Sequence, residues 1–582
     1  MLNPIVGPLR PRALIVDDAL ARPETAVGRA AESLASALES RNVEVIRAMS
    51  LEDGRAIVGS DSSLGAVLLD WNLGSNDPDS HDQATAILHK LRERLEEVPV
   101  FLLADRELTR GSMTIEVAEM VDEFVWLLED TADFVAGRVL AAIHRYQAQL
   151  LPPYARVLAD YARLREHSWS APGHQGGVAF TKHPAGRAFF DFLGENVFRT
   201  DMGIERGVLG SLLDHTGPVA ASERYAARVF GAHRSYSGVV GTSGANRSIM
   251  QACMKEDDLV VLDRNCHKSI EQGLMLTGAR PVYMVPTRNR YGIIGPISPS
   301  EMDPKTIRSK AQSGALTKTV AGQKPAYAVV TNSTYDGLCY NAVRAEALLE
   351  RSSDRIHFDE AWYGYARFNP MYRDHFAMRG DPAQHQGPTV FATHSTHKLL
   401  AALSQASFTH VRDGSGAIDH HRFNQAYMMH TTTSPLYAIV ASNDITTAMM
   451  DGSGGRSLTQ EAINEAVDFR QVVGRMHRTL ADKKDWFFKP WNVDAVEVDG
   501  RNVAFEDAPG ELLSTSQEPW KLRTGAKWHG FEDIADGWCL LDPIKVSLLA
   551  PGMGDDGKLE KTGVPAARST PGSTASASCR PG

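Results

Sequence analysis

The stretch Phe391-Ala392-Thr393-His394-Ser395-Thr396-His397-Lys398 decides how the rest of the chain is interpreted. It begins in an apolar run, residues 389–392, that predicts a short buried strand, and it ends in hydroxyl groups, two imidazoles and one lysine. A lysine behind a buried strand lies where desolvation lowers the pKa of its amine, so Lys398 is a candidate nucleophile. The neighbouring hydroxyl groups suit a phosphate.

A second stretch, Ile356-His357-Phe358-Asp359-Glu360-Ala361-Trp362, places an acid after a predicted strand and an indole three residues later. An aldehyde cofactor bound as a Schiff base needs a lysine for the aldehyde and an acid for its ring nitrogen. Taken singly, the first stretch is typical of a solvated loop, and an Asp-Glu pair after a strand is typical of a helix cap. Together, with the acid preceding Lys398, the two stretches favour a cofactor site.

Composition excludes several classes of protein. The chain has 582 residues, of which 43% are hydrophobic and 23% charged, which is enough for two or three globular domains. A net charge of −10 provides no basic surface for nucleic acid. Five cysteines without paired spacing indicate a reducing compartment, and no apolar run reaches the length of a bilayer or forms a signal peptide. We therefore expect a cytoplasmic protein.

Residues 1–145 alternate between predicted strands and helices. The expected strands are residues 13–16, 43–46, 66–69, 100–103 and 124–127, and an amphipathic helix is expected over residues 27–40. Because strands separated by helices form parallel doubly wound sheets, this pattern predicts a flavodoxin-like domain.

Three acids follow two strands of this domain and resemble the phosphoacceptor pocket of a response-regulator receiver domain. Asp17 and Asp18 follow the first strand and Asp70 the third, a pattern that would bind Mg²⁺ and accept phosphate on Asp70. However, the fourth strand ends in Ala104, where a receiver has Ser or Thr, and the fifth ends near Leu127, where it has Lys. We interpret the domain as receiver-shaped without phosphotransfer. Acids that cap loops explain the cluster equally well, so no metal ligands are assigned.

The central part of the chain has the pattern of a large α/β domain. A helix over residues 131–167, broken at Pro152-Pro153, leads into a loop rich in Pro and Gly at residues 169–177. Gly241-Thr242-Ser243-Gly244-Ala245-Asn246 then opens a helix over residues 247–254, and such a turn suits a phosphate, although it also serves as a plain cap. His267 follows a strand at residues 259–263 and can stack on a cofactor ring, whereas a lone histidine is more commonly structural.

With these segments assembled, the chain resembles the Orn/Lys/Arg decarboxylase family, bacterial pyridoxal-phosphate enzymes of fold type I. The residues that carry the resemblance are Pro172-Gly173-His174, residues 209–215, Gly241-Thr242-Ser243, residues 263–269, residues 331–337, Phe358-Asp359-Glu360-Ala361-Trp362, Ser395-Thr396-His397-Lys398 and residues 428–435. The match runs from roughly residue 150 to 565, and the family's amino-terminal wing is also receiver-shaped.

The resemblance implies the domain organisation. A receiver-like wing domain covers residues 1–145 and a linker residues 146–170. A pyridoxal-phosphate-binding large domain of the aspartate aminotransferase type covers residues 171–440, and a partial small α+β domain covers residues 441–566. Residues 567–582 are rich in Ser, Pro and Gly and are expected to be disordered, whereas family members continue with further domain sequence. We therefore expect a shortened carboxy-terminal end.

The resemblance also implies residue roles. Lys398 would form the Schiff base with pyridoxal 5'-phosphate, Asp359 would pair with the ring nitrogen, and His267 would stack on the ring. His397 or Lys398 would act as general acid. The other residues implied at the cofactor are Thr242, Ser243, Gly244, Trp362, Ser395, His397 and, from a neighbouring subunit, Ser434. Gly244 stands where many members carry Thr, so one hydroxyl group is missing there. The active sites would form in a homodimer or higher homo-oligomer.

The activity implied by the resemblance is decarboxylation of a basic amino acid (lysine, arginine or ornithine) to the amine and CO₂. Residues 358–363 and 395–400 look closer to lysine-type members than to acid-induced arginine ones. Three alternatives stay open: a catalytically impaired shortened homologue, a non-catalytic regulator built on the receiver-like domain, and a pyridoxal-phosphate enzyme that transaminates.

Overall fold

The computed structural model describes residues 11–74, 81–95, 97–104, 114–164, 169–203, 206–483, 485–561 and 563–565. The chain divides into two compact units, which we describe separately: Met1–Thr200 with Ala448–Ser457, and Asp201–Thr447 with Leu458–Gly582. Among the described residues, no helix combines the length and the apolar character needed to cross a bilayer. The tail expected to be disordered, residues 567–582, lies outside the described residues, and the domain boundaries given above remain predictions.

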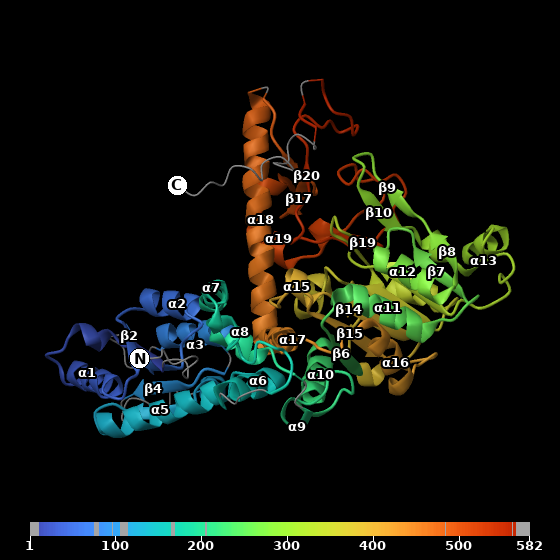
Figure 1. Ribbon diagram of the computed structural model, residues 1–582. Helices are drawn as coiled ribbons and strands as arrows, with labels where there is room; N and C mark the ends of the chain where they lie inside the picture. The colour runs from blue at the N-terminus through green and yellow to red at the C-terminus, as the bar shows by residue number, and fades with distance from the viewer. Residues whose placement is uncertain are drawn as a thin grey trace. The chain divides into compact units, whose positions relative to one another are not determined.

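The first unit is built on a parallel five-stranded sheet, drawn in blue in Figure 1. Its strands, in the order β2-β1-β3-β4-β5, are β1 (Arg12–Val16), β2 (Glu44–Ala48), β3 (Ala66–Asp70), β4 (Val100–Ala104) and β5 (Glu123–Trp126). The helices that connect them are α1 (Ala26–Glu39), α2 (Leu51–Ser60), α3 (Asp82–Arg94) and α4 (Ile115–Met120), and α5 (Ala132–Gln149) follows β5. The flavodoxin-like prediction is confirmed, and each expected strand lies within two residues of an observed one.

Helices cover both faces of this sheet, which explains why its inner strands are apolar throughout. In β3, Ala66 and Leu68 belong to one buried cluster with α1 and α5, while Val67 and Leu69 belong to a second cluster with α2 and α3. Successive side chains of a strand point to opposite faces, so a strand covered on both sides needs a continuous apolar run. The run ends at Asp70, on the carboxyl edge of the sheet.

Two carboxyl groups at this edge are strongly affected by burial. Burial raises the pKa of Asp17 to about 6 and, together with the nearby charge of Asp17, raises the pKa of Asp70 to about 7.

The predicted helix break is confirmed, since α5 ends before Pro152 and α6 (Pro153–Leu164) begins with a proline. Proline is tolerated there because the first residue of a helix needs no N–H partner. Helices α7 (Pro184–Leu193) and α8 (Glu195–Thr200) complete the unit.

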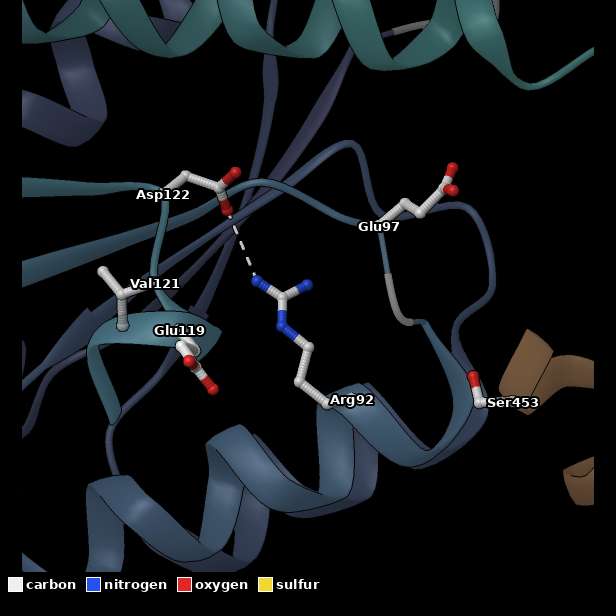
Figure 2. A pocket seen from close by; sticks show the side chains of 6 residues that line it. All are labelled: Arg92, Glu97, Glu119, Val121, Asp122 and Ser453. Carbon is white, nitrogen blue, oxygen red and sulfur yellow. Dashed lines mark hydrogen bonds and ion pairs between the residues drawn. The ribbon is translucent and has the colours of Figure 1, made fainter. Parts of the chain in front are cut away.

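The first unit also has a surface pocket of about 380 Å³. Figure 2 shows the side chains that line it, Arg92, Glu97, Glu119, Val121, Asp122 and Ser453. Arg92 is engaged with the protein, because its guanidinium lies 3.3 Å from the Asp122 carboxylate and donates to the carbonyl of Val98 at 2.8 Å. None of the residues expected at the cofactor lines this pocket, so it is not the candidate active site.

The second unit is built on a seven-stranded sheet with the order β6-β15-β14-β13-β11-β7-β8. Its strands are β6 (Arg234–Gly238), β7 (Leu259–Asp263), β8 (Arg280–Met284), β11 (Tyr327–Thr331), β13 (Arg355–Asp359), β14 (Thr389–His394) and β15 (Ser407–Arg412). The strand β15 runs antiparallel to both of its neighbours, and the other pairs are parallel. This is the large α/β domain of the fold type I enzymes, as predicted.

The chain from residue 206 onward also forms helices and short sheets (Figure 1). The helices are α9 (Arg206–Leu209), α10 (Gly217–Phe230), α11 (Gly241–Cys253), α12 (Lys268–Thr277), α13 (Pro304–Ser313), α14 (Ala342–Leu349), α15 (Thr396–Leu399), α16 (His420–His430), α17 (Tyr437–Met450), α18 (Gly452–Asp482) and α19 (Gly510–Thr515). Four two-stranded sheets pair β9 (Pro286–Arg288) with β10 (Ile294–Ile297), β12 (Leu338–Tyr340) with β19 (Cys539–Leu541), β16 (Lys489–Pro490) with β20 (Leu548–Leu549), and β17 (Ala495–Val498) with β18 (Arg501–Ala504).

A buried arginine ties α18, the long orange helix of Figure 1, to the segment that follows β19. Arg470 is 0% exposed, and its guanidinium donates to the backbone carbonyls of Lys545 at 2.7 Å, Trp491 at 3.2 Å and Pro543 at 3.3 Å. A buried cation is tolerated only when its donors are satisfied. Here the acceptors are carbonyls from two loops, so the side chain fixes both loops to the helix.

We expect the substitution Arg470→Ala to destabilise the protein by roughly 3 kcal/mol or more, because it leaves several buried carbonyls without a donor. The measurement is the urea concentration at the unfolding midpoint. The matched control is Arg475→Ala on the same helix, an exposed arginine with a single bond of 2.6 Å to the carbonyl of Glu506. The control should move the midpoint little, and equal midpoints for the two variants would contradict the role assigned to Arg470.

Candidate active site

The carboxyl edge of the central strands brings Asp359 and Lys398 together. Asp359 ends β13 and is paired in register with Thr393 of β14, while Lys398 lies in α15, directly after β14. The Lys398 ammonium lies 4.5 Å from the centre of the Trp362 ring. Burial lowers the pKa of Lys398, and the charge of Asp359 opposes this shift. The acid and the lysine therefore interact with each other within one site.

His267 borders the same space. It caps the first turn of α12, and its Nδ1 lies 2.8 Å from the Ser269 hydroxyl. Burial lowers the pKa of His267, and the charges of Asp359 and Lys398 act on it in opposite directions. The imidazole is exposed on one side, which leaves it accessible to a flat ring.

The Asp359 carboxylate is held on both oxygens. The Asn246 amide donates to Oδ2 at 2.9 Å, and the Thr393 hydroxyl and the Ala361 backbone N–H each lie 3.3 Å from Oδ1. Asn246 also donates to the Ser269 hydroxyl at 3.0 Å, so it links the carboxylate to the partner of His267. The sequence placed Asn246 before a helix and gave it no role, because a single asparagine forms no recognisable motif.

A buried chain of hydrogen bonds continues beneath Asp359. The Tyr327 hydroxyl lies 2.5 Å from His357 Nδ1, and His357 Nε2 lies 3.0 Å from the Thr393 hydroxyl. Burial lowers the pKa of His357 to about 4, so the imidazole is neutral at neutral pH and carries one proton. With the Tyr327 hydroxyl donating to Nδ1, the proton lies on Nε2 and is donated to Thr393. The Thr393 hydroxyl then donates its one proton to the Asn246 Oδ1 at 3.0 Å, with the Asp359 carboxylate as a longer neighbour at 3.3 Å.

We expect His357 to make stability depend on pH. In the unfolded chain this imidazole has the ordinary pKa near 6.5, whereas in the folded chain its pKa is about 4. The full stability of the folded state is therefore present above pH 6.5, and part of it is lost as the pH falls toward 4. The full difference is on the order of 3 kcal/mol. The variant His357→Gln should lose less stability than wild type between pH 7 and pH 4.5 in urea titrations.

The control for that measurement is His421→Gln, which replaces an exposed histidine at the start of α16. This variant should keep the wild-type pH dependence. If His357→Gln also keeps it, a neutral buried imidazole at position 357 is ruled out.

The turn at the start of α11 brings the expected phosphate residues together. The helix begins at Gly241, so the segment 241–246 forms its first turns rather than a loop before a helix at 247, which corrects the expected boundary. The chain can enter the helix there because Gly241 adopts a φ of 68°. The Thr242 and Ser395 hydroxyls hydrogen-bond to each other across two segments, and Ser243 lies between Thr242 and Gly244 in the same turn.

The remaining candidates lie on different sides of the site. His397 Nδ1 donates to the Ala406 carbonyl at 2.7 Å, and its ring lies near Gly241, on the side of the α11 turn. At Gly244 a Cβ would lie 2.2 Å from a methyl group of Val240, so a side chain there requires Val240 to move. Ser434 is exposed in the loop after α16, and its described contact is a bond to Thr432, not to the other candidates.

Lys545 is a neighbour of the site to which the sequence assigned no role. Its side chain is 11% exposed, its ammonium donates to the Ser333 hydroxyl, and it lies 3.9 Å from the Asp542 carboxylate. Burial lowers the pKa of Lys545, and its charge lowers the pKa of Lys398. A second ammonium thus lies close enough to act on the first.

The residues present fit pyridoxal 5'-phosphate. Lys398 offers an amine of lowered pKa, Asp359 a carboxylate held by donors, and His267 an exposed imidazole. The first turn of α11 has no side-chain cap, so its N–H groups are available to an anion. A Cβ built at Gly241 meets nothing closer than 3.8 Å, which indicates open space beside this turn.

Comparison with known proteins supports the same interpretation. Residues 152–570 match the model of the Orn/Lys/Arg decarboxylase major domain, and residues 26–146 match that of its N-terminal domain. The biodegradative arginine decarboxylase of Escherichia coli is 62% identical over 558 residues, which cover 96% of this chain and 74% of that protein. Lysine decarboxylase LdcA of Pseudomonas aeruginosa is 41% identical, over 94% of this chain and 71% of that protein.

Solved structures agree in fold. The structure of lysine decarboxylase A from Pseudomonas aeruginosa superposes with a TM-score of 0.86 at 40% identity, covering 96% of this chain and 73% of that one. The constitutive lysine decarboxylase of Escherichia coli gives a TM-score of 0.77 at 33% identity, covering 96% and 72%. These matches include both sheets described above.

Proposed function

The chain belongs to the Orn/Lys/Arg decarboxylase family, whose members are pyridoxal-phosphate-dependent decarboxylases of basic amino acids, and we propose that its substrate is arginine. We propose further that Lys398 and Asp359 hold the cofactor from opposite sides. The observation that carries this is their placement at the ends of adjacent strands, with the charges of both acting on His267. The non-catalytic regulator considered from the sequence has no support among the relatives.

Arginine is favoured by overall similarity. The chain is 62% identical to a biodegradative arginine decarboxylase, against 41% and 37% for lysine decarboxylases over similar lengths. The motifs that pointed to lysine, residues 358–363 and 395–400, lie at the expected cofactor contacts. A segment that contacts the cofactor is a weaker guide to the substrate than identity over the whole chain. Lysine is the second candidate.

The cofactor and Asp359 provide the driving force for loss of CO₂. When bound, pyridoxal phosphate supplies an electron-withdrawing ring that accepts the electron pair released by the substrate's Cα–carboxylate bond. Asp359 would hold the ring nitrogen and would keep its proton in place. Asn246 and Thr393 are positioning residues: the Asn246 amide donates to one carboxylate oxygen, and the Thr393 hydroxyl fixes that amide by donating to its Oδ1 at 3.0 Å.

Lys398 holds the aldehyde end and returns a proton. Burial, together with the charge of Lys545, lowers the pKa of Lys398, which raises the fraction of the uncharged nucleophilic amine. Beside Trp362, Lys398 in its ammonium form would be the general acid that supplies the proton taking the place of the lost carboxylate. His397 is less suited to this step, because its Nδ1 is engaged with the Ala406 carbonyl.

The phosphate is assigned to the first turn of α11. Its free N–H groups and the Thr242, Ser243 and Ser395 hydroxyls supply donors, and the helix dipole favours an anion. Gly244 supplies a backbone N–H and no hydroxyl, and the close approach of Val240 is a reason for glycine at this position. His267 would stack on the ring.

An exposed aromatic side chain lies beside Trp362 at the candidate site. Tyr335 is 78% exposed and lies edge-on to Trp362, with ring centres 5.7 Å apart. Exposed aromatic side chains beside a cofactor are typical of an interface, so we assign the active form to a homodimer or a larger homo-oligomer.

The four described cysteines, Cys253, Cys266, Cys339 and Cys539, are free thiols, which agrees with the reducing cytoplasm.

The purified chain, supplied with pyridoxal phosphate, should release CO₂ from arginine and form agmatine at least about tenfold faster than it forms the amines of lysine or ornithine. Product amines are separated by chromatography. The variant Lys398→Ala should lose the activity, whereas Lys255→Ala, which replaces an exposed lysine, should keep it. After borohydride reduction, the wild-type peptide that contains Lys398 should carry the mass of the cofactor.

Two outcomes would contradict this proposal. Faster turnover of lysine would assign the substrate to the second candidate. A product that retains its carboxylate would show transamination instead of decarboxylation.

A further inference from the structure

Three carboxylates meet at the carboxyl edge of the sheet in the first unit, apart from every residue used in the mechanism. One ligand atom from each of Asp17, Asp18 and Asp70 lies within 4.8 Å of the other two. We propose that these residues form a binding site for a hard divalent cation, with Mg²⁺ as the first choice. This departs from the expectation of no metal ligands that the sequence supported.

The position of the cluster in the fold is that of a ligand site. Asp17 follows β1 and Asp70 ends β3, and these strands are neighbours in the order β2-β1-β3-β4-β5. The helix after β1 packs on one face of the sheet and the helix after β3 on the other. In open parallel sheets the loops separate at such a switch point, and a crevice forms at the carboxyl ends of the strands.

A buried and unpartnered oxygen provides the second, independent observation. Asp17 is 1% exposed, and its Oδ1 accepts the backbone N–H of Ala19 at 2.8 Å. Its Oδ2 is buried and has no hydrogen-bond partner among the described residues. An unpaired buried carboxylate oxygen costs several kcal/mol, so native structures supply a donor, a proton or a cation.

Capping of loops, the alternative considered from the sequence, accounts for only one carboxylate oxygen of Asp17 and one of Asp70. Asp17 caps a short 3₁₀ helix through Oδ1, and Asp70 accepts the N–H of Asn72, also through Oδ1. Capping therefore leaves the second oxygen of Asp17 unexplained. Asp18 is paired with Arg22 at 3.2 Å on the exposed side, which does not provide a donor to Asp17.

The chemistry of the donor set selects the class of ion. The three side chains offer carboxylate oxygens only, which suits Mg²⁺, Mn²⁺ or Ca²⁺ and not the softer metals that prefer imidazole or thiolate. Three like charges this close repel one another, and a divalent cation offsets the repulsion. The neighbouring strand β4 ends in Ala104, which offers no hydroxyl to the site, so we assign cation binding without phosphate transfer.

The test uses the full chain and Mn²⁺, whose unpaired electrons report the free ion directly by electron paramagnetic resonance. Wild type should bind one Mn²⁺ per chain at this site, and Mg²⁺ should displace it. Asp17→Asn and Asp70→Asn should each weaken binding by at least about tenfold, because each removes one charged ligand. Glu52→Gln is the matched control, since Glu52 is an exposed acid of the same unit in the first turn of α2, and it should bind as wild type does.

A thermal measurement separates loss of the site from loss of the fold. Without metal, both asparagine variants should unfold at or above the wild-type temperature, because the substitutions remove charge repulsion. Added Mg²⁺ should raise the unfolding temperature of wild type and of Glu52→Gln, and should not raise that of the two variants. Absence of Mn²⁺ binding at millimolar concentration, or binding that survives in both variants, would overturn the proposal. Neither measurement involves the decarboxylase activity.

Discussion

The active site depends on one constraint, the orientation of the Asp359 carboxylate relative to Lys398. Both oxygens of Asp359 accept hydrogen bonds, from Asn246 on one side and from a backbone N–H on the other. A carboxylate held in this way presents a fixed charge to a ring nitrogen and costs nothing to reorganise during the reaction. If the carboxylate were free to rotate, the lysine would still bind the aldehyde, but the ring would lose its electronic anchor.

The large sheet produces this constraint through strand register. Asp359 and Thr393 are partners on neighbouring parallel strands, so the hydroxyl lies beside the carboxylate, and Lys398 lies in the short helix α15 that follows β14. Asn246 reaches it from α11, the helix whose first turn is assigned to the phosphate. One helix and two strands therefore carry the residues proposed to hold both ends of the cofactor. His357 and Tyr327 extend the support into the core, where a neutral imidazole avoids a buried charge.

The sequence was sufficient for the strands and for the acid–lysine pair, since apolar runs ending in polar residues mark the carboxyl edge of a parallel sheet. It did not reveal Asn246, His357 or Lys545, because a single polar residue in a helix or strand has no periodicity that shows what it faces. The start of α11 at Gly241 was also missed, because Gly, Thr and Ser favour turns and caps over helix interiors. The role of Ser434 stays a prediction, since it involves a second subunit.

The most direct test is the ¹⁵N chemical shift of the ring nitrogen in pyridoxal phosphate bound to the intact protein. We predict the shift of a protonated ring nitrogen in wild type above neutral pH. In Asp359→Asn, with the fold and the Lys398 attachment retained, we predict the shift of an unprotonated nitrogen. An unchanged shift in that variant would contradict the assignment of Asp359 as the group that holds the ring proton.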